Sequence, residues 1–203
     1  MLMIDMLRHG DLQGGVRYRG VIDDPLTCQG RERMDAVWQE LVGQVDLIVC
    51  SPLSRCSMPA HEWAQQAGVA CLEDERLREL HYGAWEGKTA EEISRQWPGQ
   101  LERWRRDPTG MCPPGGEAPE SLRQRVMNWW EDACASWQGR RILVVAHSGS
   151  LRMLLAIVLG GNLSMTRRVD MPYACWSRAC VDRLGRSWLV FHNRSVCNHD
   201  IQR

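Results

Sequence analysis

Apolar residues along the chain alternate between short continuous runs and stripes at helical spacing. The short runs predict strands buried in a parallel sheet at residues 2–7, 45–51 and 140–148, although Asp5 interrupts the first of them. The stripes have the spacing of one helix face and predict helices over residues 30–43, 54–68 and 148–161. Strand and helix therefore alternate along the chain, which is typical of an α/β sandwich.

The last part of the chain predicts a hairpin, and a middle section predicts a helical insertion. Residues 174–184 and 186–193 flank Gly185 and have the pattern of two paired strands. Within residues 88–138, two helical segments surround a loop rich in Pro and Gly. We therefore expect a three-layer αβα sandwich with a mainly parallel central sheet and a helical insertion over the carboxyl ends of the strands. A length of 203 residues suits one catalytic domain, over residues 1–203, that carries this insertion.

Charge and cysteine content exclude several function classes. Lys+Arg and Asp+Glu both number 25, so the formal net charge is +0, which argues against nucleic acid or a membrane as partner. The 9 cysteines are odd in number and scattered, without a CxxC pair or Cys/His ligand spacing, so we expect reduced thiols and no metal site. The first residues lack the pattern of a signal peptide, and no apolar run reaches transmembrane length. These features predict a cytoplasmic protein.

Polar side chains capable of chemistry follow the predicted strands. Ligand sites of open α/β sheets collect at the carboxyl ends of the strands, so these side chains are expected to meet at one edge of the sheet. A single histidine or arginine at a strand end usually caps a turn or meets solvent, but the joint pattern after three strands indicates a site. The candidates are Arg8 and His9 after the first run, Ser51 and Arg55 after the second, His147 and Ser148 after the third, and Glu79 between the second and third.

This set of side chains indicates phosphoryl transfer through a covalent intermediate. A neutral imidazole is a competent nucleophile near neutral pH, so we expect His9 to attack phosphorus with one ring nitrogen while the other donates to a backbone carbonyl. Gly10 is expected to leave room for the backbone to approach the phosphate. We expect Glu79 to give a proton to the leaving alkoxide and then to act as base toward the water that hydrolyses phospho-His9.

Positively charged groups are expected to bind the phosphate itself. Arg8 and Arg55 can each fork onto nonbridging oxygens, His147 can add a third donor, and the helix that begins near Ser148 can add its N-terminal amides. Fixed donors of this kind hold the charge on the oxygens while the phosphoryl group moves in line. We therefore expect a reaction with no cofactor and no metal.

Five segments resemble, in order and spacing, the motifs of the histidine phosphatase superfamily, which includes the cofactor-dependent phosphoglycerate mutases. The segments are "LRHG", "PLTCQG", "SPLSRC", "LRELHYGAWEG" and "VVAHSGSLR". The resemblance implies a phosphohistidine at His9, a proton donor at Glu79, and phosphate contacts from Arg8, Arg55 and His147. These are the same five residues that the strand-end pattern indicates.

The chain departs from the family pattern beside the first motif. Asp11 and Leu12 stand where Glu-Thr or Glu-Ser is usual, and Gly15 stands where Asn is common. None of these three changes removes a group that the expected chemistry requires. They do change the inner wall of the expected phosphate pocket.

The segments around the motifs bear on the substrate. "GGVRYRGVIDDPLTCQG" and "PPGGEAPESLRQRV" are most similar to the α-ribazole phosphatases of cobalamin biosynthesis. That likeness implies α-ribazole 5′-phosphate, or adenosylcobalamin 5′-phosphate, as substrate. Candidate substrate contacts, each of which could equally be structural, are Tyr18, Arg19, Tyr82 and Glu117. Trp97 and Trp104 either line the substrate pocket or pack between helices.

Two other functions stay open at this point. A mutase or a broad phosphatase acting on sugar or nucleotide phosphates would use the same catalytic residues, and pocket shape decides between them. A catalytically idle binding module of the same fold would usually have lost some of the five polar groups, which are all present here. The expected partner is a small phosphomonoester, and the expected assembly is a monomer or a homodimer.

Overall fold

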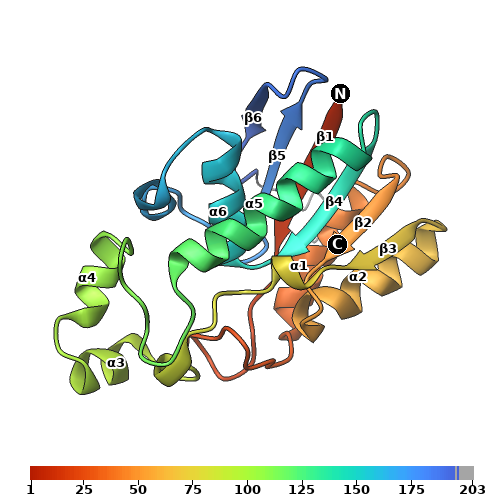
Figure 1. Cartoon of the computed structure of the whole chain (residues 1–203). Coiled ribbons are helices and arrows are strands. Elements are labelled where there is room, and N and C mark those ends of the chain that lie inside the picture. The colour runs from red at the N-terminus through yellow and green to blue at the C-terminus, as the bar shows by residue number, and fades with distance from the viewer. Residues whose placement is uncertain (195, 197–203) are drawn as a thin grey trace.

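A six-stranded sheet forms the centre of the computed structural model, which describes residues 1–194 and 196 (Figure 1). Its strands are β1 (Leu2–Arg8), β2 (Leu47–Cys50), β3 (Ala70–Glu73), β4 (Arg141–Ala146), β5 (Trp176–Val181) and β6 (Ser187–Phe191). They lie in the order β3-β2-β4-β1-β5-β6. The first four are mutually parallel, whereas β5 and β6 run antiparallel as a hairpin at one edge. The expected mainly parallel sheet and the closing hairpin are confirmed.

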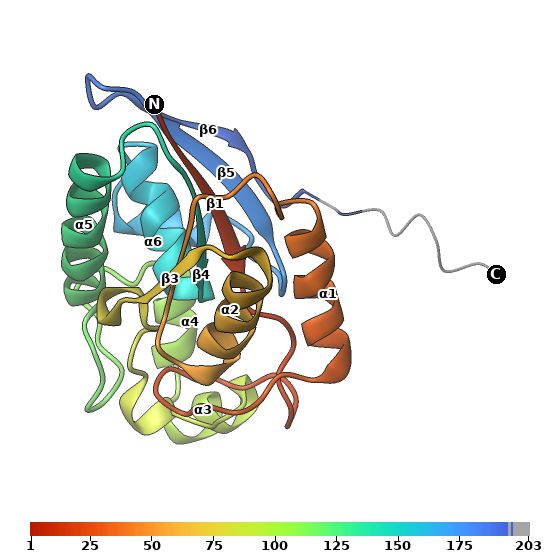
Figure 2. The same ribbon diagram turned by 90° about the vertical axis from the view of Figure 1, so that its right-hand side faces the viewer.

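Helices cover both faces of this sheet (Figure 2). The helices α1 (Cys28–Gln39) and α2 (Ser54–Ala67) lie on one face, and α5 (Pro119–Ser136) and α6 (Ser148–Val158) lie on the other. On the first face the indoles of Trp38 and Trp63 stack at 5.6 Å between ring centroids. On the second face Val126 and Trp129 of α5 pack fully buried with the apolar side of the strands. The three-layer αβα sandwich is therefore confirmed.

Local sequence explains where the helices begin and end. Thr27 caps α1, because its side chain accepts a hydrogen bond from the backbone N–H of Gly30. Gly68 ends α2 in the left-handed conformation, with φ 67°, which glycine adopts without a steric cost. Pro59 lies in the second turn of α2, and the helix continues through it.

The section predicted as an insertion divides into two parts. Its first helical segment is broken by Pro98 and Gly99 into α3 (Ala90–Gln96) and α4 (Gln100–Arg106), and Gly99 has φ 75°. These two short helices lie beyond the carboxyl ends of the parallel strands (Figure 1). The second segment, α5, instead belongs to the helical layer beside α6 (Figure 2). The part that covers the strand ends is therefore shorter than residues 88–138.

Strand β3 was not expected from the sequence. It contains four residues, three of them exposed, and it lies at the edge of the sheet, so it lacks the apolar run that marks a buried strand. Three short 3-10 helices join the main elements: η1 (Glu75–Leu77), η2 (Gly83–Trp85) and η3 (Leu163–Arg167). Within the described part of the chain, no helix is both long and apolar enough to cross a membrane.

The polar residue that interrupts the first apolar run has a buried role. Asp5 is fully buried in β1, where its carboxylate accepts hydrogen bonds from the indole of Trp176 and from the guanidinium groups of Arg141 and Arg178. The two arginines come from the neighbouring strands β4 and β5. Because a buried charge is tolerated only when it is paired, this cluster explains how an aspartate occurs inside the central strand.

Candidate active site

His9 directly follows β1, and its backbone N–H donates to the carbonyl of Ala146 at 3.0 Å. Its Nδ1 lies 2.8 Å from the carbonyl oxygen of Gly10. Because a carbonyl can only accept, Nδ1 carries the hydrogen, and Nε2 of the neutral ring keeps a free lone pair. Burial and the charges of Arg8 and Arg55 hold the pKa of His9 well below its usual value of 6.5. The ring is therefore neutral near pH 7, as a nitrogen nucleophile must be.

Gly10 lies where two backbone segments are in contact. A Cβ at this position would lie 2.1 Å from the backbone oxygen of Gly30, in the first turns of α1. Only glycine therefore fits here without a shift of the backbone. This close contact places the loop after β1 against the start of α1.

Glu79 faces the same cavity as His9 and is 7% exposed. Its Oε1 accepts the backbone N–H of Leu80 and its Oε2 accepts the backbone N–H of Gly149, each at 3.0 Å. A Cβ on Gly149 would lie 2.2 Å from Oε1, so only glycine leaves space for the carboxylate here. The first turn of α6 therefore fixes the position of Glu79.

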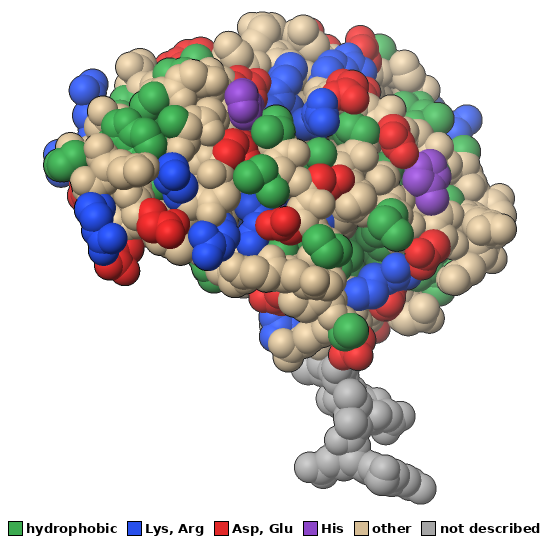
Figure 3. All heavy atoms as spheres, turned by 90° about the horizontal axis from the view of Figure 1, so that it is seen from below, with side chains coloured by type: hydrophobic (Ala, Val, Ile, Leu, Met, Phe, Trp, Pro, Cys, Tyr) green, Lys and Arg blue, Asp and Glu red, His purple; other side chains and the backbone are tan. Residues whose placement is uncertain are grey.

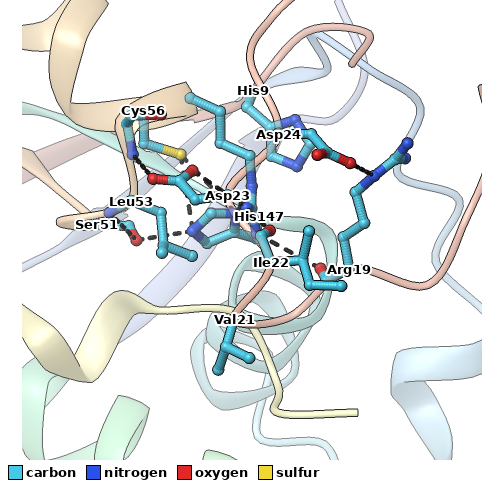
Figure 4. A network of polar contacts seen from close by, with 12 residues as sticks. His9, Arg19, Val21, Ile22, Asp23, Asp24, Ser51, Leu53, Cys56 and His147 are labelled. Carbon is cyan, nitrogen blue, oxygen red and sulfur yellow. Dashed lines mark hydrogen bonds and ion pairs between the residues drawn. The ribbon is translucent and has the colours of Figure 1, made fainter. Parts of the chain in front are cut away.

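His147 and Arg55 lie behind His9 rather than on the cavity wall. The Nε of Arg55 donates to Nδ1 of His147 at 3.2 Å, so Nε2 of His147 carries the hydrogen and donates to Ser51 Oγ at 2.7 Å (Figure 4). The other nitrogens of Arg55 donate to the carbonyls of Gly20 and Ile22 at 2.9 Å and 2.7 Å. Both side chains are buried, and their polar contacts in this structure are to each other, to Ser51 and to the loop after β1.

The two residues lie beside His9 in the fold. The rings of His9 and His147 lie 5.2 Å apart between centroids. Burial, together with the charge of Arg55, lowers the pKa of His147 well below its usual value. His147 is thus a second neutral ring packed behind the first.

Arg8 lies on the cavity wall as expected. Its Nη1 donates to the carbonyl of Met171 at 2.5 Å, and its guanidinium carbon lies 3.9 Å from the ring centroid of Tyr173. Its Nε is buried and has no hydrogen-bond partner among the described residues. Burial lowers the pKa of Arg8, and the charge of Glu79 is among the influences that oppose this lowering.

The cavity in front of His9 has a volume of about 350 Å³ and a strongly basic wall. Acidic and basic side chains are mixed over the outer surface at this end of the molecule (Figure 3). The cavity wall, in contrast, combines one carboxylate, that of Glu79, with six arginines: Arg8, Arg17, Arg19, Arg105, Arg152 and Arg167. Ser148, the first residue of α6, is also on the wall. This chemistry fits a ligand with several negative charges.

Of the four predicted substrate contacts, three lie on the cavity wall and one does not. Tyr18, Arg19 and Tyr82 lie on the cavity wall, with the rings of Tyr18 and Tyr82 in edge contact at 5.2 Å. Glu117 does not lie there; it pairs with Arg125 at 2.8 Å and accepts the backbone N–H of His81 at 3.2 Å. Through these contacts Glu117 attaches the Pro/Gly-rich loop to the segment that carries Glu79.

Of the two tryptophans predicted to line the pocket or to pack between helices, one lies on the cavity wall and the other packs against the core. Trp104 lies on the wall and is 3% exposed. Trp97 packs half-buried against the apolar core.

Five polar or aromatic residues of the wall were missed by the sequence interpretation: Arg17, Arg105, Arg152, Arg167 and Tyr173. Arg152 could have been found, because it lies one helical turn after Ser148 and therefore on the same face of α6. Arg167 and Tyr173 belong to η3 and the irregular segment after it, where no periodicity points to the sheet edge.

The departures beside the first motif have structural partners. Asp11 pairs with Arg33 at 3.0 Å, and Leu12 lies on the cavity wall. The carbonyl of Gly15 accepts a hydrogen bond from Nη1 of Arg19 at 2.7 Å. Arg19 is held further by an ion pair with Asp24.

A neutral buried histidine, a fixed carboxylate and an arginine-rich cavity lie together at the carboxyl ends of a parallel sheet, an arrangement typical of α/β proteins that bind phosphorylated ligands. The chain belongs to the histidine phosphatase superfamily (branch 1), whose sequence profile matches residues 4–194.

Phosphatases of three kinds illustrate the relationship. A glucosyl-3-phosphoglycerate phosphatase of Mycobacterium tuberculosis is 36% identical over 166 residues, covering 76% of this chain and 74% of its own. The solved structure of a mycobacterial protein with the same name superposes with a TM-score of 0.87 at 30% identity, over 95% of this chain and 99% of that chain. Phosphoserine phosphatase 1 of Hydrogenobacter thermophilus is 28% identical over 167 residues, or 81% of this chain and 79% of its own. The α-ribazole phosphatase of Shigella flexneri superposes with a TM-score of 0.83 at 25% identity, over 95% of this chain and 96% of that chain.

Some matched proteins are much longer. The chain spans 49% of a Mycobacterium tuberculosis protein described as bifunctional, to which it is 31% identical over 178 residues.

Proposed function

We propose that the chain is a phosphomonoesterase that works through a phosphohistidine at His9. The observation that carries this proposal is the neutral His9 ring, with a free Nε2 lone pair, on the wall of the cavity that also holds Glu79 and Arg8. Nε2 forms the N–P bond while the P–O bond to the alcohol breaks, and Glu79 protonates the leaving oxygen. Water then attacks phosphorus with Glu79 as base, the N–P bond breaks, and His9 is regenerated with release of phosphate.

The surrounding residues stabilise the transferring group. Arg8 and the N-terminal end of α6 at Ser148 supply donors toward the phosphoryl oxygens. Arg55 and His147 act as positioning residues, because their nitrogens are bound to each other, to Ser51 and to the loop after β1. No step of this sequence requires a cofactor.

Substitution of His9 and Glu79 tests the mechanism with different signatures. His9→Ala should abolish both turnover and the acid-labile phosphoenzyme. Glu79→Gln should slow turnover of an alkyl phosphate by about 10²–10⁴, the usual contribution of a general acid. With p-nitrophenyl phosphate, whose leaving group needs no proton, Glu79→Gln should instead accumulate phosphoenzyme. An Ala variant at position 9 that keeps wild-type turnover would exclude the mechanism.

For the substrate, α-ribazole 5′-phosphate is the first candidate, with adenosylcobalamin 5′-phosphate beside it. The resemblance of residues 14–30 and 113–126 to α-ribazole phosphatases supports it, as does the likeness to the Shigella flexneri structure. The cavity wall also has an aromatic side, formed by Tyr18, Tyr82 and Trp104, which can contact a planar base.

A second candidate is a phosphomonoester with another acidic group. Arg152 and Arg167 lie on the wall in addition to Arg8, and the buried Nε of Arg167 has no hydrogen-bond partner among the described residues. Such a surplus of guanidinium groups fits a carboxylate or a further phosphate. The M. tuberculosis relative, named for a phosphoglycerate substrate, supports the same class.

Turnover across a substrate panel separates these candidates. The panel contains α-ribazole 5′-phosphate, adenosylcobalamin 5′-phosphate, glucosyl-3-phosphoglycerate, phosphoserine, phosphoglycerates and simple sugar and nucleoside phosphates. A kcat/KM for one substrate that exceeds the others by about 10² or more identifies the substrate class. A smaller ratio would indicate an enzyme that binds many phosphomonoesters about equally well. Arg167→Gln should raise KM for an acid-bearing substrate and leave p-nitrophenyl phosphate nearly unchanged. Isomerisation of phosphoglycerate without phosphate release would indicate a mutase.

A further inference from the structure

Two cysteines and a histidine meet at the edge of the sheet outside the arginine-rich cavity. Cys50 ends β2, Cys71 lies on β3, and His61 lies on α2. The two sulfur atoms are 3.8 Å apart, and the three ligand atoms, one from each side chain, all lie within 4.8 Å of one another. The sequence showed no such cluster, because positions 50, 61 and 71 have none of the short spacings that mark a metal motif. We propose that Cys50, His61 and Cys71 form a binding site for a thiophilic divalent metal ion, with zinc as its natural occupant.

The distance between the sulfur atoms fits a tetrahedral ion. Two thiolates bound to zinc at about 2.3 Å with a tetrahedral angle between them lie about 3.8 Å apart. Cys50 and Cys71 already have this separation without a bond between them. The histidine nitrogen must approach the sulfur atoms by about 1 Å to complete the site, given a Zn–N distance near 2.0 Å. The His61 side chain is 51% exposed, so its rotamer is free to make this adjustment.

Glu73 supplies the partner that a metal-binding histidine usually has. Its Oε1 lies 2.7 Å from Nε2 of His61. A carboxylate that holds one ring N–H fixes the tautomer and leaves the other nitrogen free to bind a metal. Glu73 stands two residues after Cys71 on β3, and alternate residues of a strand share a face, so both side chains lie on the same side of the sheet.

The ligand set selects the kind of ion. Two thiolates and one imidazole are the donors that zinc prefers, whereas Mg²⁺ and Ca²⁺ require oxygen ligands. Three protein ligands leave a fourth position for water or for the Glu73 carboxylate. Because the ligands come from three different elements, an ion would join β2, β3 and α2. Cys50 immediately precedes Ser51, which contacts His147, so the proposed site is one residue from the hydrogen bonds around His147.

The test is metal binding by the reduced, chelator-treated full chain. Titration with Zn²⁺ against a chromophoric chelator should give one tight equivalent per chain, and Co²⁺ should give a thiolate-to-metal charge-transfer band. Cys71→Ser should weaken the affinity by at least 100-fold and remove the band. His61→Ala should also weaken it strongly, and Glu73→Gln should weaken it by about 10–100-fold, as expected for a residue that orients a ligand.

The control is Cys112→Ser, which removes an exposed thiol far from β3 in the chain. It should bind Zn²⁺ as the wild type does. Zn²⁺ should also raise the Tm of the wild type and of Cys112→Ser, but not the Tm of Cys71→Ser. A cooperative melting transition of Cys71→Ser shows that this variant is folded and has lost only the ability to bind Zn²⁺. Stoichiometric binding that survives Cys71→Ser, or the absence of tight binding, would overturn the proposal. If Cys50 and Cys71 form a disulfide in air and the oxidised chain still binds Zn²⁺ as tightly, the two cysteines are not the ligands, and the proposal is overturned as well.

Discussion

Glu79 and Gly149 act as one unit, although they are 70 positions apart in the sequence. The carboxylate accepts the Gly149 N–H at 3.0 Å, and a Cβ on Gly149 would enter the space of Oε1 at 2.2 Å. The glycine after Ser148 is thus explained by the carboxylate it contacts, as well as by its place in the first turn of α6. The smallest side chain of the site controls the position of the proposed proton donor.

We therefore predict that Gly149→Ala displaces Glu79 and lowers kcat for an alkyl phosphate by about 10², since a misplaced general acid loses most of its contribution. Turnover of p-nitrophenyl phosphate should fall much less. Adding Gly149→Ala to Glu79→Gln should cost little more than Glu79→Gln alone, because the two changes act on one interaction. Additive losses in this double-mutant cycle would show that Gly149 acts by another route.

The burial of His9 predicts a pH dependence of stability. Its folded-state pKa lies well below the usual 6.5, so below about pH 6.5 the unfolded chain binds a proton at His9 that the folded chain does not. Stability from this residue is complete at higher pH and is lost as pH falls from about 6.5 toward the folded-state pKa, by at most about 1.4 kcal/mol per pH unit.

Urea unfolding of the wild type and of His9→Gln between pH 5 and pH 7.5, a range of about 2.5 units around the histidine pKa, measures this contribution. The free energy of unfolding of the wild type should fall more steeply toward acid than that of the variant. Equal slopes would mean that His9 takes up a proton in the folded state.

At the scale of elements, the central strand β1 depends on one buried carboxylate. Asp5 joins β1 to β4 through Arg141 and to β5 through Arg178 and Trp176. Removing one partner of a buried ion pair costs about 3–5 kcal/mol, because the remaining charges lose their compensation. The arginine side chains here are 16% and 17% exposed, so the cost should lie at the lower end of that range.

Asp5→Asn should accordingly lower the free energy of unfolding by about 3 kcal/mol. Arg186→Gln, which removes a pair with Asp182 on a side chain that is 77% exposed, is the control and should change it by less than about 1 kcal/mol. Chemical denaturation of both variants checks the contrast. A loss of similar size in both would remove the special role of the buried cluster.

The elements that could be predicted from sequence are those buried on both sides. β2 and β4 carry continuous apolar runs, β1 carries one that only Asp5 interrupts, and α6 is apolar on most of its faces, so their patterns are strong. The edge strand β3 has no such pattern, because one side of its ladder and most of its side chains face solvent. The break between α3 and α4 was signalled by Pro98 and Gly99, but the helical periodicity on either side concealed it.

The candidate site was predictable to the same extent. The ends of parallel strands must meet at one edge, so His9, Glu79 and Ser148 could be brought together from sequence alone. The direction of a side chain could not, and Arg55 and His147 turn toward each other rather than toward the cavity. The proposed metal-ligand cluster was hidden for a related reason, because Cys71 lies on the unpredicted strand β3 and meets Cys50 only through the register of β3 with β2.

For the whole molecule, the distribution of charge matters more than its sum. The formal net charge is +0, yet six arginines face the cavity with one carboxylate. Basic groups that line one concave wall concentrate their field at its mouth, and this field steers anions toward the site. Salt screens such a field, because the Debye length falls from about 30 Å at 0.01 M to about 3 Å at 1 M ionic strength.

We therefore predict that kcat/KM for p-nitrophenyl phosphate falls by about tenfold or more over this range of ionic strength, while kcat changes little. Arg105→Gln removes an exposed guanidinium from the cavity wall and should make the dependence on salt less steep. Arg186→Gln removes the same charge from the β5–β6 turn, at the opposite end of the sheet (Figure 1), and should leave the dependence unchanged. Equal slopes for the wild type and both variants would show that capture of the substrate depends on contact inside the cavity rather than on the field around it.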